Sequence, residues 1–213
     1  MSKLFQHILD FPTAYRSFQR LVSPKESIPT HKILAQYIEE KFPEHKIIDI
    51  GCGDAIMASF LKEESDYIGL DYNPEYIKKA KEKYPGFDFR IADVSEIDPG
   101  SNKVIYILMG VVHHLDDNQV KELFTKIMKT NPEALIFCFD GVRLPKQNII
   151  ATLMMDLDRG NHVRTFEGYG GVLEGFNFIV RSDLLALPYN HILSAYNFNV
   201  CELNDYMTEM RAS

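Results

Sequence analysis

A glycine-containing turn directly after an apolar run is the part of this chain whose residue types point most clearly to chemistry. Residues 47–54 read IIDIGCGD, so that a strand-like run ends in Asp49, Gly51 and Gly53. Glycine lacks a Cβ and adopts positive φ, which lets the backbone approach a ligand closely. We expect a helix over residues 55–62, whose free N–H groups would face that ligand. The pattern predicts a small-molecule site after the first strand.

Three later strand-like runs also end in residues that suit a ligand. Asp71 ends the second run, 18 residues beyond Gly53, close to the spacing of roughly 20 for an acid that binds a ribose diol. Asp93-Val94 follows the third run and offers a carboxylate and an N–H for the edge of an adenine. Met109-Gly110 closes the fourth. Because parallel strands end at one edge of a sheet, we expect these positions to converge on one crevice.

The turn does not fit two other nucleotide-binding patterns. The dinucleotide fingerprint G-x-G-x-x-G requires a third glycine where this chain has Ile56, and no P-loop lysine follows. Asp49 is instead placed to meet a ligand ammonium or to orient the turn. A nicotinamide-dependent oxidoreductase remains an alternative that a failure to bind NAD would exclude.

Strand-like and helix-like runs alternate through the middle of the chain. The strand-like runs are 46–50, 67–70, 87–91, 104–108 and 134–139, and the helix-like runs are 55–62, 74–83, 118–130 and 148–157. This alternation predicts an α/β fold with a mostly parallel sheet and helices on both faces. Two late runs, 176–180 and 191–198, predict an antiparallel pair, and three glycines argue against a helix over 166–173.

These elements divide the chain into three parts. Residues 1–43 form an N-terminal helical extension, in which the helix carrying Tyr15 is a candidate lid over the crevice. Residues 44–200 form one domain with an insertion at about 145–175, and residues 201–213 form a polar tail.

Composition excludes several classes of protein. The net charge is −7 and the lysines around residues 78–83 are interrupted by acids, so no basic stripe for nucleic acid is present. The three cysteines, Cys52, Cys138 and Cys201, show neither disulfide nor zinc spacing. The longest apolar run, 104–112, is too short for a membrane span, and no signal peptide is visible. We expect a cytoplasmic protein that acts on neither a nucleic acid nor a membrane and that could form a homodimer.

The ordered motifs resemble those of class I S-adenosylmethionine-dependent methyltransferases. The resemblance covers roughly residues 45–140 and rests on Asp49-Ile-Gly51-Cys-Gly53, Asp71, Ala92-Asp93-Val94 and the segment 109–115. It implies a Rossmann-like seven-stranded sheet with an antiparallel C-terminal hairpin. It also implies that S-adenosyl-L-methionine is the cofactor, with the methionine part at the glycine turn, the ribose at Asp71 and the adenine at Asp93-Val94. The implied cofactor-binding set is Asp49, Gly51, Cys52, Gly53, Asp71, Tyr72, Asp93, Val94, Met109 and Gly110.

Two adjacent histidines follow the fourth strand, where a methyl acceptor would lie. His113 and His114 titrate near neutral pH and are candidate general bases, with His113 preferred. The alternative is that they only pack against, or cap, the helix that begins near Asp116. Adjacent histidines on a short turn point in different directions, so no metal site is predicted.

Further residues are candidates for binding the acceptor. Arginines in the insertion could hold an anionic acceptor by bidentate contacts, or could form ion pairs with the nearby Asp156, Asp158 or Glu167. The candidate set is Tyr15, Arg159, Arg164, Tyr169, Tyr189 and His191. The sequence thus predicts a methyltransferase acting on a small molecule, such as a metabolite or glycan precursor. The alternative is a non-catalytic subunit that binds S-adenosylmethionine and supports a partner.

The glycine turn departs from the family pattern at one position. The segment reads Gly53-Asp54-Ala55, where the family more often has a further glycine. An alanine is tolerated there without strain if the backbone has negative φ.

Overall fold

A computed structural model describes residues 28–92, 103–147, 152, 155, 162–176, 178–184, 191–197, 202–203 and 205–206, and omits the side chains of 28–29, 179–184 and 191–193. Part of the sequence-based prediction falls outside these ranges. This holds for the first N-terminal helix with Tyr15, for most of the helix expected over 148–157, and for most of the polar tail. The division into extension, domain and tail stays a prediction.

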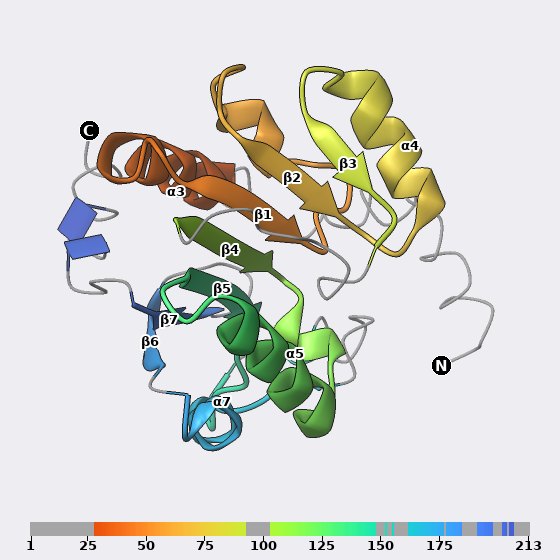
Figure 1. The fold of residues 1–213 in the computed structure, drawn as a ribbon. Helices are drawn as coiled ribbons and strands as arrows, with labels where there is room; N and C mark the ends of the chain where they lie inside the picture. The colour runs from red at the N-terminus through yellow and green to blue at the C-terminus, as the bar shows by residue number, and fades with distance from the viewer. Residues whose placement is uncertain are drawn as a thin grey trace.

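A seven-stranded sheet in the order β3-β2-β1-β4-β5-β7-β6 forms the centre of the molecule (Figure 1). Its first five strands run parallel, whereas β7 is antiparallel to β5 and β6 is antiparallel to β7. This confirms the predicted fold class. The strands are β1 (Lys46–Ile50), β2 (Tyr67–Leu70), β3 (Asp88–Arg90), β4 (Val104–Met109), β5 (Leu135–Gly141), β6 (Ile179–Leu184) and β7 (His191–Tyr196).

Helices cover both faces of the sheet, and each face has its own apolar core. The helices are α3 (Ile28–Lys41), α4 (Pro74–Lys83), α5 (Asp117–Thr130) and α7 (Phe166–Leu173). Side chains alternate across a strand, so Ile47 packs with α3 and α4 while Ile48 packs with α5 and α7. Figure 1 shows these two helix layers on opposite sides of the strands. Parallel strands covered on both sides are almost wholly apolar, as the buried β4 is.

The helix predicted over residues 55–62 is wrong. The segment forms only a short 3-10 helix, η2 (Met57–Phe60), followed by the extended residue Leu61. Ala55 has φ of +58°, a left-handed conformation that cannot belong to a right-handed helix. Residues 55–62 therefore present no α-helix N-terminus to the glycine turn, and we expect the turn to bind a ligand through its own backbone.

The prediction against a helix over residues 166–173 is also wrong. The segment forms α7 in spite of its three glycines, each of which costs a helix about 1 kcal/mol relative to alanine. Thr165 caps it by accepting a hydrogen bond from the N–H of Gly168 at 3.1 Å. Tyr169, Val172 and Leu173 are buried against α5 and the sheet. Tertiary packing outweighs the weak local propensity.

Candidate active site

The glycine turn and the acid after β2 meet at the carboxyl edge of the sheet, as predicted. The N–H of Gly53 donates to Asp71 Oδ2 at 2.9 Å, across 18 residues of sequence. The N–H groups of Gly51 and Cys52 both donate to the carbonyl of Leu70, at 2.7 and 2.9 Å. The turn is thus fastened to the end of β2. This edge lies where the strand order reverses between β1 and β4, the usual place of a ligand in an open α/β sheet.

The two glycines are required by the shape of the turn. Gly51 and Gly53 have φ of +71° and +53°. A Cβ on Gly51 would also lie 2.6 Å from Cγ2 of Val111, whereas one on Gly53 would meet nothing within 4 Å. Gly51 is therefore demanded by both conformation and space, and Gly53 by conformation.

The position at which this turn has alanine in place of the family's glycine has positive φ. Ala55 has φ of +58° and is fully buried. A left-handed conformation costs an ordinary residue about 1–2 kcal/mol. The turn therefore keeps the backbone of the glycine-rich pattern even where the glycine has been replaced.

Asp71 is held as a fixed acceptor at the end of β2. Its side chain accepts from Gly53 through Oδ2 and from the N–H of Asn73 through Oδ1 at 2.8 Å. The residue is 8% exposed. Asn73 in turn caps α4 by accepting from the N–H of Glu75 at 2.9 Å. Because each oxygen accepts one of these hydrogen bonds, both oxygens of the Asp71 carboxylate are held in a fixed orientation.

Two large apolar side chains stand in solvent beside this acid. Tyr72 is 86% exposed and directly follows Asp71, and Ile91 is 59% exposed and directly follows β3. The N–H of Asp71 donates to the carbonyl of Arg90 at 3.3 Å, which brings the two strand ends together. Exposed apolar surface at a strand edge suits the flat face of a base. Sequence reasoning selected Tyr72 but missed Ile91, although its place directly before Ala92-Asp93 was a signal. Asp93 and Val94 lie outside the described residues.

Asp49 is buried within β1. Its Oδ2 accepts a hydrogen bond from the hydroxyl of Tyr67 at 2.7 Å. Burial raises the pKa of Asp49 to about 7; the Tyr67 hydrogen bond opposes this rise and nearby Asp71 adds to it. Tyr67 is a partner that sequence reasoning missed, although the parallel pairing of neighbouring strands could have indicated it. Of the two roles expected for Asp49, its contact with Tyr67 on β2 fits orientation of the turn.

Cys52 is a packed residue of the turn. Its side chain is buried, and burial raises the pKa of the thiol far above its usual range. A thiol of this kind is unreactive at neutral pH. Any contribution of Cys52 to a ligand comes through its backbone.

The turn after β4 carries a buried histidine–aspartate pair. The turn begins after Met109 with Gly110, which has φ of +72° and whose N–H donates to the carbonyl of Phe139 at 2.7 Å. His113 lies on the 3-10 helix η4 (Val112–His114), and its Nδ1 is 2.8 Å from Asp140 Oδ1 at the end of β5. The N–H of His113 donates to the same oxygen at 3.1 Å. The sequence predicted His113 as a candidate base but not its contact with Asp140.

His114 differs from His113 in exposure. His113 is buried, whereas His114 is exposed, and their ring centroids lie 4.3 Å apart. Neither histidine caps α5, because Asp116 does so itself: it accepts from the N–H groups of Asn118 and Gln119, each at 2.9 Å. The Gln119 side chain completes a capping box.

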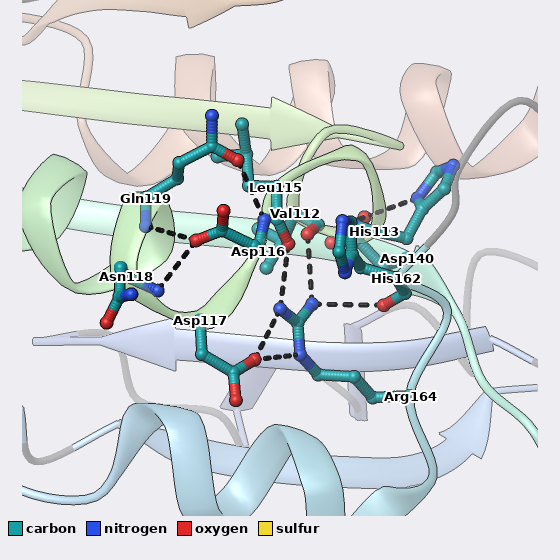
Figure 2. A network of polar contacts seen from close by, with 10 residues as sticks. All are labelled: Val112, His113, Leu115, Asp116, Asp117, Asn118, Gln119, Asp140, His162 and Arg164. Atoms are coloured by element: carbon teal, nitrogen blue, oxygen red, sulfur yellow. Dashed lines mark hydrogen bonds and ion pairs between the residues drawn. The ribbon is translucent and has the colours of Figure 1, made fainter.

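Arg164 lies against this turn with its whole guanidinium engaged by the protein (Figure 2). Its ion-pair partner among the described residues is Asp117. Of the acids considered from sequence, Asp156 and Asp158 lie outside those residues. Tyr169 is buried and its hydroxyl donates to the carbonyl of Gly141 at 2.9 Å. Both residues thus hold protein segments together in this structure.

The remaining candidates for acceptor binding are largely outside the description. His191 lies in β7 and pairs through its backbone with Gly141 of β5, and its side chain is not described. Tyr15, Arg159 and Tyr189 lie outside the described residues.

The part of the chain that the structure describes contains no group of three or more His, Cys, Asp or Glu side chains placed to hold a metal ion. It also contains no helix with the length and apolar character needed to cross a membrane.

Comparison with known proteins agrees with the fold and with the motifs. Residues 47–130 match the family model described as a methyltransferase domain. A methyltransferase candidate of Invertebrate iridescent virus 6, 235L, is 32% identical over 108 residues, which are 42% of this chain and 40% of that protein. The chain therefore spans well under half the length of this curated relative.

Solved structures of similar fold include two methyltransferases with bound ligands. The plantazolicin methyltransferase BpumL, in complex with S-adenosylhomocysteine, has a TM-score of 0.63 at 14% identity, covering 90% of this chain and 93% of that one. Human N-acetylserotonin methyltransferase, in complex with S-adenosylmethionine, has a TM-score of 0.62 at 19% identity, covering 92% and 60%. At such identities the likeness establishes the fold.

The matched segment contains the glycine turn, Asp71 and the β4 turn. Residues 47–130 thus resemble a methyltransferase domain, and the fold is that of class I S-adenosylmethionine-dependent methyltransferases. This confirms the resemblance that the sequence motifs predicted.

Proposed function

We propose that this chain transfers a methyl group from S-adenosylmethionine to a small-molecule acceptor and releases S-adenosylhomocysteine. One observation carries the proposal: the Gly53 N–H lies 2.9 Å from the Asp71 carboxylate. This contact joins a turn of positive-φ residues to an oriented acid at the switch point of the sheet. It supports a single site that binds both the polar end and the ribose of one ligand.

The residues present fit this cofactor. The turn offers bare backbone because its Gly51 and Gly53 carry no side chain, and Asp71 offers oriented oxygens for two ribose hydroxyls. Hydrogen bonds to a charged acceptor are worth roughly 1.5–3 kcal/mol each. Tyr72 and Ile91 supply exposed apolar surface for the base. Asp93 and Val94 remain predicted contacts of the adenine edge.

The cofactor, when bound, supplies a methyl group on a sulfonium sulfur that is already activated toward in-line attack. The protein must then hold the acceptor in line, exclude water and, for a hydroxyl acceptor, take up its proton. Positioning of this kind supplies roughly 7–11 kcal/mol of a barrier.

For a hydroxyl acceptor, we propose that His113 takes up this proton, since a buried carboxylate fixes its ring. Because Asp140 accepts at Nδ1, the neutral ring carries its hydrogen there and keeps the lone pair on Nε2. The proton leaving the acceptor would pass to Nε2, and the buried carboxylate would stabilise the resulting imidazolium. A general base of this kind contributes typically ~10²–10⁴-fold. His114, being exposed, is the second candidate.

A small acceptor fits the charge of the protein better than a nucleic acid does. The net charge is −7, which does not favour a polyanion. The two solved structures of similar fold are a plantazolicin methyltransferase and an N-acetylserotonin methyltransferase. We extend the small-molecule class, and neither compound, to this chain. The insertion at about 145–175 would face the acceptor, since its residues 162–164 contact the β4 turn.

A paired binding and turnover experiment tests this function. Calorimetry with S-adenosylmethionine is followed by measurement of S-adenosylhomocysteine release with hydroxyl, amine and carboxylate acceptors. We expect binding and turnover with at least one class, and loss of turnover in His113→Gln with donor affinity retained. Binding without turnover across all classes would favour the non-catalytic subunit, and absence of donor binding would contradict both.

A further inference from the structure

The side chain of Arg164 makes five hydrogen bonds, one for each of its N–H groups. Nε and Nη2 donate to Asp117 Oδ1 at 3.0 and 2.7 Å. Nη1 donates to the carbonyls of Val112 at 3.1 Å and His162 at 3.0 Å, and Nη2 also donates to the carbonyl of Leu115 at 2.7 Å. Figure 2 shows the guanidinium at the centre of this network. An anionic acceptor could bind Arg164 only by displacing these partners.

The carbonyls that Arg164 binds bracket the two histidines of the β4 turn. Val112 directly precedes His113, and Leu115 directly follows His114. The turn itself is only the three-residue helix η4, closed by the N–H of His114 on Val111 at 2.9 Å and that of Leu115 on Val112 at 3.2 Å. So short a helix holds its shape poorly by itself. Arg164 fixes both of its ends from a segment about 50 residues later in the chain.

Backbone contacts fasten the same segment to the histidine and to the strand that carries its partner. The N–H of His162 donates to the carbonyl of His113 at 3.0 Å. The carbonyl of Arg164 accepts from the N–H of Arg143 at 2.9 Å, three residues beyond Asp140. Residues 162–164 therefore bridge the turn that carries His113 and the strand end that carries Asp140.

The geometry of the pair depends on where this bridge places the turn. Asp140 Oδ1 accepts from both the ring and the backbone N–H of His113, at 2.8 and 3.1 Å. A shift of the turn would change both distances at once. Because Oδ1 selects the Nδ1–H tautomer, the same shift would release the ring to its other tautomer.

We propose that Arg164 is a positioning residue, which holds the Val112–Leu115 turn so that His113 keeps its Nδ1–H on Asp140. Its importance for catalysis rests on the proposed function, whereas the tautomer it selects can be observed without any acceptor. Arginine is required because a lysine ammonium has three donors and no planar fork. Lysine at position 164 could keep the pair with Asp117 but would lose at least one of the carbonyls that bracket the histidines.

The test measures the His113 tautomer in ¹⁵N-histidine-labelled protein, with His113→Gln assigning the signal. We expect the wild type to show the Nδ1–H form alone, and Arg164→Lys to show both tautomers while donor affinity changes less than about threefold. Arg90→Lys makes the same substitution in an exposed pair with Asp88, and should leave the tautomer unchanged. A single Nδ1–H form in Arg164→Lys would overturn the proposal.

Two further measurements distinguish the effect of Arg164 on the turn from the effect of its ion pair with Asp117 and from a general loss of stability. Asp117→Asn removes the charge of an exposed partner and leaves the carbonyl contacts, so it should keep the tautomer. An equal change in Asp117→Asn and Arg164→Lys would overturn the proposal. With an active acceptor, Arg164→Lys should lower kcat at least about tenfold, part of the ~10²–10⁴-fold of a general base, at unchanged KM for the donor.

If Arg164→Lys does not fold, native-state hydrogen exchange of the wild type tests the proposal without the variant. The amide of His162, which donates to His113, should exchange slowly together with the buried sheet. Exchange at the rate of an exposed loop would overturn the proposal. Lack of turnover in the wild type would count against the proposed function and leave both of these structural readouts in place.

Discussion

The turns after β1 and β4 lie on neighbouring parallel strands, yet they are built in opposite ways. The β1 turn takes its shape from residue type, with positive φ at Gly51, Gly53 and Ala55. The β4 turn has a single positive-φ glycine, Gly110, and is held mainly by side chains elsewhere, since Asp140 and Arg164 bind it from 27 and about 50 residues away. We infer that the β1 turn presents bare backbone to a ligand, whereas the β4 turn presents an oriented side chain.

Next to each of the two turns lies a buried carboxylate, and the two carboxylates have different partners. Asp49 accepts from the phenol of Tyr67, and Asp140 accepts from the imidazole of His113. A phenol stays neutral near pH 7 and cannot compensate a buried negative charge, whereas an imidazole can become positive. This difference fits a role for Asp49 in orienting the β1 turn and a role for the Asp140–His113 pair in proton transfer at the β4 turn.

The largest effect should come from Gly51→Ala, which attacks the β1 turn where residue type decides its shape. The new Cβ would lie 2.6 Å from Val111 Cγ2 at φ of +71°. Strain of about 1–2 kcal/mol and overpacking of about 1–3 kcal/mol should together lower the free energy of unfolding by roughly 2–5 kcal/mol. Urea denaturation measures this loss.

Substitutions at two other glycines serve as controls for the same measurement. Gly53→Ala has the strained φ without a close neighbour, and should lose only the strain, about 1–2 kcal/mol. Gly86→Ala has neither, and should stay within about 0.5 kcal/mol of the wild type. Equal losses in Gly51→Ala and Gly86→Ala would show that the turn does not depend on glycine.

The next largest effect concerns Asp49, the buried acid beside the β1 turn. The pKa of Asp49 is raised to about 7, so between about pH 4 and 7 the folded state holds a proton that the unfolded state has lost. Stability from this group is therefore present at low pH and lost as pH rises. Asp49→Asn does not titrate and can still accept from Tyr67. Urea unfolding should show it gaining about 1–4 kcal/mol on the wild type between pH 5 and pH 8; parallel profiles would refute the assignment.

A smaller effect should follow from removing the cap next to the β4 turn. Asp116→Ala loses the capping box of α5 and should lower the free energy of unfolding by about 1 kcal/mol. Glu122→Ala breaks only an exposed pair with Lys126 on the same helix, and should cost at most about 0.5 kcal/mol. Thermal denaturation compares the two, and equal costs would mean that the cap contributes nothing special.

The smallest effect should come from Ala55→Gly. Relief of about 1–2 kcal/mol of strain is offset by loss of a buried methyl, about 0.8 kcal/mol, and by the entropy of glycine, about 0.5–1 kcal/mol. The net change should be near zero. Ala58→Gly, at a buried alanine of η2 without positive φ, should instead cost about 1–2 kcal/mol. Chemical denaturation that gave both variants the same loss would contradict the strained conformation at Ala55.

The contrast between the turns also explains what the sequence could predict. Asp49, Gly51, Gly53 and Asp71 were found because their types and spacing follow from local geometry and from parallel strand ends. The Asp140–His113 pair and the bridge from Arg164 were not, because they depend on contacts between distant segments. The helix α7 was rejected because propensity is local, while the burial of Tyr169 and Val172 that stabilises it is tertiary.

The central claim is that the β1 turn and Asp71 form one binding site, and calorimetric titration with S-adenosylmethionine tests it most directly. Asp71→Ala should raise the Kd at least about tenfold, equivalent to 1.4 kcal/mol, in a folded protein. Asp66→Ala removes an exposed acid at the opposite end of the same strand and should leave the Kd unchanged. Unchanged affinity in Asp71→Ala, or an equal loss in Asp66→Ala, would contradict the account.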